Sequence, residues 1–189
     1  LKSRIAGDSI DFSADGILFI DHFSLYNFSM TQTLQTDLDI NLNSTEGGVR
    51  FNKSKIDIDN FSFELNGFIS SDNVLDLSLS GKNIDISGIK GYVPDKHKAK
   101  ISDYNPGGII NIEGKFTGPI TRTVNPHIEI NFDLGKGHVT YGKSATRIDN
   151  LSFKWSFTNG DEMKPATSSL IIEDFKGTLG SAGYKGSLT

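Results

Sequence analysis

The sequence predicts a mainly β protein, built either as an extended, curled antiparallel sheet with a taco-like groove or as a β-sandwich. Apolar and polar residues alternate along most of the chain, which is the period of a strand with one apolar face. The twenty Gly, five Pro and many Ser, Asn and Asp residues supply turns and favour short strands over long helices. Only residues 87–103 lack the alternation, so we expect one short helical segment near 87–103.

The first forty residues predict strands with little interruption, with a turn at Asp15-Gly16. The apolar residues Phe23 and Leu25 fall on odd positions, whereas those of residues 26–42 fall mainly on even ones. This change of parity predicts a bulge or bend near Leu25. One strand over 26–42 would span about 55 Å, at 3.3 Å per residue, so we expect a break around residues 31–33.

Two stretches of the chain, residues 58–65 and 148–155, nearly repeat one another. Each begins Ile-Asp-Asn and then carries Phe, Leu or Trp at every second position. Such recurrence indicates a sheet extended by similar strands, with both copies lining the same buried face. We therefore interpret residues 1–189 as a single β-rich domain, or as a fragment of a larger region.

Asn66-Gly67 has the composition of a tight hairpin turn, but the surrounding pattern argues against one. Apolar residues keep the same parity from Phe61 to Ile69, so we expect the strand to run through Gly67 and to turn at residues 70–73. Asn159-Gly160 differs, because the alternation stops before it; we expect a loop there.

Proline divides the helical segment near 87–103, because the residue before Pro94 avoids the α region. Alternation resumes over residues 110–116 and again from Pro126 to Leu134. Further strands are expected in both places.

The composition and the motifs of the chain argue against an enzyme and against a metal-binding protein. The chain has no Cys, and its four His residues lack the spacing of a metal site. There is no Gly-x-Ser-x-Gly motif, and the carboxylates lie on the polar sides of strands. The net charge of −4 argues against nucleic-acid binding, and the one basic cluster, residues 96–100, is typical of a solvated face. We therefore expect neither an enzyme nor a cofactor or metal site.

The distinctive feature of the sequence is the apolar side that its strands share. With almost no helix to cover it, a sheet of this length must fold on itself as a sandwich or curl into a trough. A trough leaves an apolar lining that is costly in water unless an apolar ligand occupies it. The residues predicted to line such a groove are Leu75, Leu77, Leu79, Ile110, Ile112, Ile128, Ile130, Phe132, Leu134 and Trp155.

Several strand motifs follow one another in a recognisable order. They are Leu75-Asp-Leu-Ser-Leu-Ser-Gly81, then Asn83-Ile-Asp-Ile-Ser87 before a short helix, Gly108-Ile-Ile-Asn-Ile-Glu-Gly114-Lys-Phe-Thr-Gly118-Pro119, Pro126-His-Ile-Glu-Ile-Asn-Phe-Asp-Leu134 and Gly137-His-Val-Thr-Tyr141. From about residue 15 to the end, this order resembles the AsmA-like proteins of Gram-negative envelopes, relatives of the TamB type.

The resemblance implies a periplasmic protein anchored in the inner membrane by an N-terminal helix absent from this chain. It implies a curled sheet whose groove holds the acyl chains of phospholipids, possible contact with neighbouring strands of the full-length protein, and a role in lipid transport and in outer-membrane assembly and homeostasis. The family offers no catalytic residues. The alternatives are a closed β-sandwich binding module, adhesin-like or carbohydrate-binding, and a structural spacer.

Overall fold

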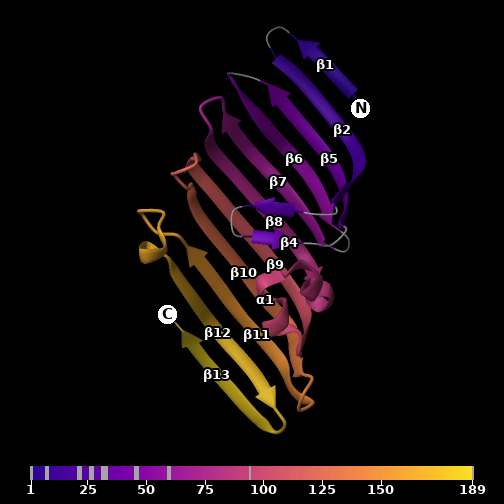
Figure 1. The fold of residues 1–189 in the computed structure, drawn as a ribbon, viewed down its shortest axis with the longest axis vertical. Helices are drawn as coiled ribbons and strands as arrows, with labels where there is room; N and C mark the ends of the chain where they lie inside the picture. The colour runs from indigo at the N-terminus through magenta and orange to yellow at the C-terminus, as the bar shows by residue number, and fades with distance from the viewer. Residues whose placement is uncertain are drawn as a thin grey trace.

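The chain forms one open antiparallel sheet of eleven strands in this computed structural model (Figure 1). The structure describes residues 2–6, 9–20, 23–25, 28–30, 34–44, 47–58, 61–93 and 95–188. The sheet runs in the order β1-β2-β5-β6-β7-β8-β9-β10-β11-β12-β13, and β3 with β4 forms a separate two-stranded ribbon. The predicted mainly β fold is confirmed. Of the two predicted architectures, the structure has the extended antiparallel sheet. The β-sandwich alternative is wrong, because the long strands pair side by side in one layer.

The strands of the sheet are long for a protein of this size. Their bounds are β1 (Lys2–Ala6), β2 (Ser9–Ile20), β5 (Leu34–Ser44), β6 (Gly48–Ile58), β7 (Phe61–Ser70), β8 (Val74–Asp85), β9 (Tyr104–Pro119), β10 (His127–Tyr141), β11 (Thr146–Thr158), β12 (Ser169–Leu179) and β13 (Ala182–Leu188). The ribbon consists of β3 (Phe23–Leu25) and β4 (Phe28–Met30).

The predicted helical segment is confirmed as two short pieces between β8 and β9. A 3₁₀ helix, η1 (Ile86–Tyr92), begins where the Asp85 carboxylate accepts a hydrogen bond from the Ser87 backbone N–H. The α-helix α1 (Asp95–Ile101) follows. Pro94 lies outside the described residues. A further 3₁₀ turn, η2 (Pro165–Thr167), lies in the loop between β11 and β12.

Two predictions about glycine-containing pairs are confirmed. Gly67 lies inside β7 with a φ of 126°, and the turn comes after Ser70, where the Asn73 N–H donates to the Ser70 carbonyl over 3.0 Å. β11 ends immediately before Asn159, so Asn159-Gly160 begins a loop. At Gly67 the phase of the apolar residues predicted the outcome better than the Asn-Gly pair did.

The predicted turn at Asp15-Gly16 is wrong. Both residues lie within β2, where Gly16 is directly opposite Leu38 of β5. Pairing along the whole strand outweighs the local preference of Asp-Gly for a turn. The bend predicted after Leu25 and the break at residues 31–33 fall on positions outside the described residues; β4 ends at Met30 and β5 begins at Leu34.

The two copies of the repeat have different local structures. In the first copy, Ile58 ends β6 and lies opposite Phe61 of β7, while residues 59 and 60 are outside the described part of the chain. The second copy lies within β11, where Asn150 has a φ of 51° and the register with β12 shifts. Asn tolerates the left-handed region that this bulge requires.

The solvent-accessible surface area of the protein shows how open the sheet is. The protein exposes 12334 Å², whereas a compact monomer of 20.6 kDa exposes roughly 8,900 Å². Among the described apolar side chains, only Phe61, Ile84 and Leu134 are buried. Most apolar side chains of the sheet are therefore only half covered.

Candidate binding faces of the sheet

Strand register brings apolar residues together on one face, here called the apolar face. Directly opposite residues of antiparallel strands point to the same side of a sheet. Leu79 of β8 is opposite Gly114 of β9, which is opposite Ile130 of β10, and Ile130 is opposite Phe157 of β11. The pairings place all ten predicted lining residues on this face: Leu75, Leu77, Leu79, Ile110, Ile112, Ile128, Ile130, Phe132, Leu134 and Trp155.

The same pairings add residues to the apolar face that were not among the predicted lining. These are Leu65, Ile69, Ile84, Phe116, Phe153, Phe157, Leu170 and Ile172. Their alternation was visible in the sequence. What was missing was the strand order, without which one apolar stripe cannot be aligned with the next.

Aromatic rings cluster where the apolar face crosses β10, β11 and β12. The centroid of Phe132 lies 4.4 Å from that of Trp155 and 5.8 Å from that of Phe153, both in edge-on arrangements. Phe153 also lies 6.4 Å from Phe175, and Trp155 lies 6.5 Å from Phe157. Such contacts hold the rings in fixed positions while leaving the side chains half-buried.

Glycines on the apolar face leave room for larger neighbours. A Cβ on Gly81 would lie 2.7 Å from Ile84 Cδ1 and 3.0 Å from Phe63 Cδ1. A Cβ on Gly114 would lie 3.2 Å from the ring of Phe116. The apolar side chains therefore lean over the glycines and close the surface between strands.

The apolar face continues to the edge strand β13. Leu170 is opposite Phe157, and Leu188 is opposite Ile172. Leu188 is 61% exposed, and every residue of β13 is exposed. The face thus becomes more open toward this edge.

The opposite side of the sheet is polar. A hollow of about 310 Å³ lies there, lined mainly by polar residues; they are Asn111, Glu113, Asn131, Asp133, Lys154, Ser156 and Glu173, together with Phe132 and Trp155. The Asn111 amide donates to Asp133 over 3.1 Å, and the Lys154 ammonium lies 3.3 Å from Asp174. These groups pair with one another across strands, which is typical of a solvated face.

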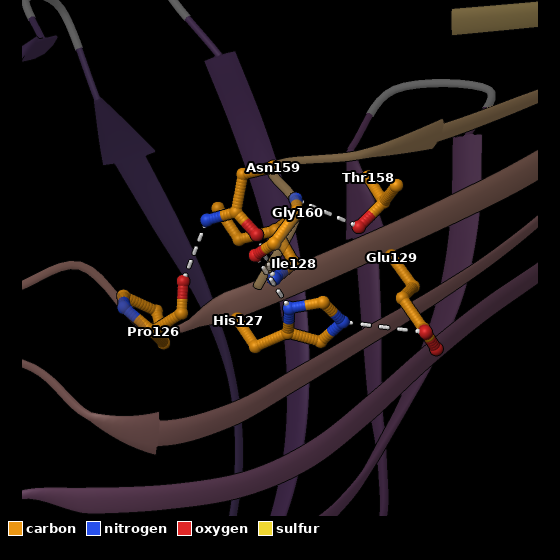
Figure 2. A network of polar contacts seen from close by, with 7 residues as sticks. All are labelled: Pro126, His127, Ile128, Glu129, Thr158, Asn159 and Gly160. Carbon is orange, nitrogen blue, oxygen red and sulfur yellow. Dashed lines mark hydrogen bonds and ion pairs between the residues drawn. The ribbon is translucent and has the colours of Figure 1, made fainter. Parts of the chain in front are cut away.

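A buried asparagine joins the start of β10 to the loop after β11 through hydrogen bonds (Figure 2). The Asn159 side chain, 7% exposed, donates to the Pro126 carbonyl and accepts from the Ile128 N–H, each over 2.8 Å. The His127 ring lies between the Gly160 carbonyl and the Glu129 carboxylate, 3.3 Å from each. Because its hydrogen bonds join the start of β10 to the loop after β11, we assign the network a structural role.

Among the described residues, no group of three or more His, Asp or Glu is arranged to hold a metal ion. None of the helices in this part of the chain is long and apolar enough to cross a membrane. No protein-family model matches the chain, and no curated protein or solved structure matches it.

Proposed function

We propose that this protein is an AsmA-like module of the Gram-negative cell envelope that binds phospholipid acyl chains on its apolar face. In this role it would serve lipid transport and outer-membrane assembly in the periplasm, anchored to the inner membrane through a segment outside this chain. The observation that carries the proposal is the unbroken apolar face from β7 to β12, half exposed and aligned row by row.

The physical argument rests on area. A contiguous apolar surface of this extent is unfavourable in water and is relieved when an apolar ligand covers it, at about 25 cal/mol per Å². An acyl chain gains about 0.8 kcal/mol for each buried CH₂. Because the lining carries few polar groups, we expect selection by chain length more than by headgroup.

The experiment is uptake of a fluorescent fatty acid or phospholipid by the purified chain. Trp155 reports the location, since a brominated acyl chain on the apolar face should quench its emission. Trp155→Phe should remove this signal without abolishing uptake. Ile130→Ser should weaken binding by about ten-fold, whereas Asn131→Ser, the adjacent residue on the polar face, should leave it unchanged.

The rival function is a structural spacer that binds no lipid. A folded chain that takes up none of the lipids, with Trp155 emission unaffected by brominated chains, would favour the spacer and end the lipid proposal. Circular dichroism of each variant separates loss of binding from loss of folding.

A further inference from the structure

The residues that follow α1 lie beside a second basic segment that is distant in the sequence. β9 begins at Tyr104, which is opposite Tyr141, the last residue of β10. Beyond this pair, the Gly142 N–H donates to the Asp103 carbonyl, and the Lys143 ammonium lies 2.7 Å from the Asp103 carboxylate. Residues 82–103 and 136–149 therefore meet at one end of the sheet, here called the helical end, where η1 contacts β9.

The helical end is positively charged in a chain that is negative as a whole. Residues 82–103 contain five Lys and three Asp, and residues 136–149 contain two Lys, one Arg and one Asp. This is an excess of four positive charges, against a net charge of −4 for the chain. Segregation of this kind creates a local positive potential that the net charge conceals.

The other end of the sheet lacks this excess. Three of its connections, residues 70–74, 119–127 and 159–168, carry two basic and three acidic residues. The basic ones are Arg122 and Lys164, and the acidic ones are Asp72, Asp161 and Glu162. These three connections carry one more acidic than basic residue, opposite in sign to the excess over residues 82–103 and 136–149.

Three lysine side chains at the helical end are exposed to solvent, and hydrogen bonds from a fourth lysine hold the backbone in place. Lys82, Lys100 and Lys136 are exposed. The Lys90 ammonium donates to the Ser102 carbonyl and to the Asn105 amide oxygen, each over 2.7 Å, and so ties η1 to the start of β9.

An aromatic side chain adds a second feature to the helical end. The Tyr104 ring is 46% exposed, and its centroid lies 5.1 Å from that of Tyr141. Exposed lysines and a half-exposed tyrosine at the same end of a sheet are the composition that favours the interface between a bilayer and water.

We propose that the helical end docks on the surface of an anionic phospholipid bilayer. Each lysine near such a surface strengthens binding by roughly five-fold, within a screening distance of about 8 Å at physiological salt. Docking goes beyond the proposed function, because it concerns where the protein meets a membrane and not what its apolar face holds. The row formed by Ile84, Ile110 and Leu134 lies next to this end, so docking would bring the apolar face to the lipid surface.

The test is sedimentation of the purified chain with vesicles of phosphatidylcholine containing phosphatidylglycerol, and with vesicles of phosphatidylcholine alone. The wild type should bind the anionic vesicles, and raised salt should release it. The triple variant Lys82→Gln, Lys100→Gln and Lys136→Gln should lose roughly a hundred-fold in affinity. A control variant, Lys115→Gln, Arg122→Gln and Lys185→Gln, removes the same charge from exposed positions elsewhere and should bind like the wild type.

Equal losses in the two triple variants, or equal binding to both kinds of vesicle, would overturn the proposal. Binding to duplex DNA as tight as to anionic vesicles, with the same loss in the first variant, would assign the surface to nucleic acid instead. Uptake of monomeric fatty acid, followed through Trp155, should be the same in all three proteins. Failure of docking and failure of lipid uptake are therefore separate results.

Discussion

Phe132 and Trp155 occupy directly opposite positions on β10 and β11, and their ring centroids lie 4.4 Å apart at an interplanar angle of 60°. This pair is the centre of the aromatic part of the apolar face. Edge-on aromatic pairs contribute about 0.5–1.5 kcal/mol beyond the area that they bury.

A double-mutant cycle with Phe132→Leu and Trp155→Leu should therefore give a coupling energy of about 1 kcal/mol in urea unfolding. As a control, Leu75→Ala combined with Trp155→Leu should be additive within about 0.5 kcal/mol, since Leu75 lies on a different strand opposite Ile69. A coupling energy near zero for the first pair would contradict the assigned contact.

A charge on the apolar face should be poorly tolerated in either copy of the repeat. Phe63→Asp and Phe153→Asp should each cost several kcal/mol or prevent folding, because an unpaired carboxylate would be placed among apolar side chains. Ser78→Asp, at an exposed position opposite Lys115 and between Leu77 and Leu79, should change the free energy of unfolding far less. Unchanged unfolding midpoints for the two Phe variants would mean that the faces are inverted.

The glycine inside β7 should be irreplaceable. Gly67 has a φ of 126°, and a Cβ there would overlap the Asp76 carbonyl oxygen of the neighbouring strand. Gly67→Ala should destabilise the protein by about 3 kcal/mol or more, from backbone strain and overpacking together. Gly135→Ala serves as the control, because a Cβ at that position would meet open space, with no neighbouring atom within 4 Å; its unfolding midpoint should stay close to the wild-type value.

Removing the Asn159 side chain should loosen the join between the start of β10 and the loop after β11. Asn159→Ala leaves the Pro126 carbonyl and the Ile128 N–H without their side-chain partner, at a cost of about 2–4 kcal/mol. Asn159→Asp keeps the acceptor for the Ile128 N–H but places a buried carboxylate oxygen against the Pro126 carbonyl, so at neutral pH it should be no more stable than Asn159→Ala. Amide exchange at Ile128 is the specific measurement: protection should fall in Asn159→Ala and persist in Asn159→Asp.

Acid should remove one contribution to stability at Asp57. The Lys55 ammonium, 2.8 Å from the carboxylate, and the Ser62 hydroxyl hydrogen-bond to the charged form and lower the pKa of Asp57 below its ordinary value of 3.8. Because the pKa of Asp57 is lower in the folded than in the unfolded state, its carboxylate stabilises the folded protein at pH values above the unfolded pKa. This stabilisation is lost as the pH falls through the folded pKa. The contribution should stay below about 1 kcal/mol, because Lys55 is largely exposed.

The measurement for Asp57 is urea unfolding of the wild type and Asp57→Asn across pH. The difference in free energy should be constant at neutral pH and should close below the unfolded pKa of 3.8. Lys55→Met should remove most of the same pH dependence. A difference that widens in acid would contradict the assignment.

Much of the apolar face could be predicted from the sequence, because the period of a strand is a local property. Leu75, Leu77 and Leu79 share a side in any strand that contains them, whatever the partner. Leu188 could not be assigned to this face, since its exposure depends on β13 being the edge strand of the finished sheet.

The sequence by itself determined the class of structure, the passage of β7 through Gly67 and a short helical segment near 87–103, all of which follow from periodicity and backbone chemistry within a few residues. Only the tertiary structure decided that the strands form one open layer, that β2 continues through Gly16, and that the second repeat bends at Asn150. It alone brought residues 82–103 beside 136–149. Strand pairing joins residues far apart in the chain, and the hydrogen bonds and side-chain contacts that choose the partner exist only once both strands are in place.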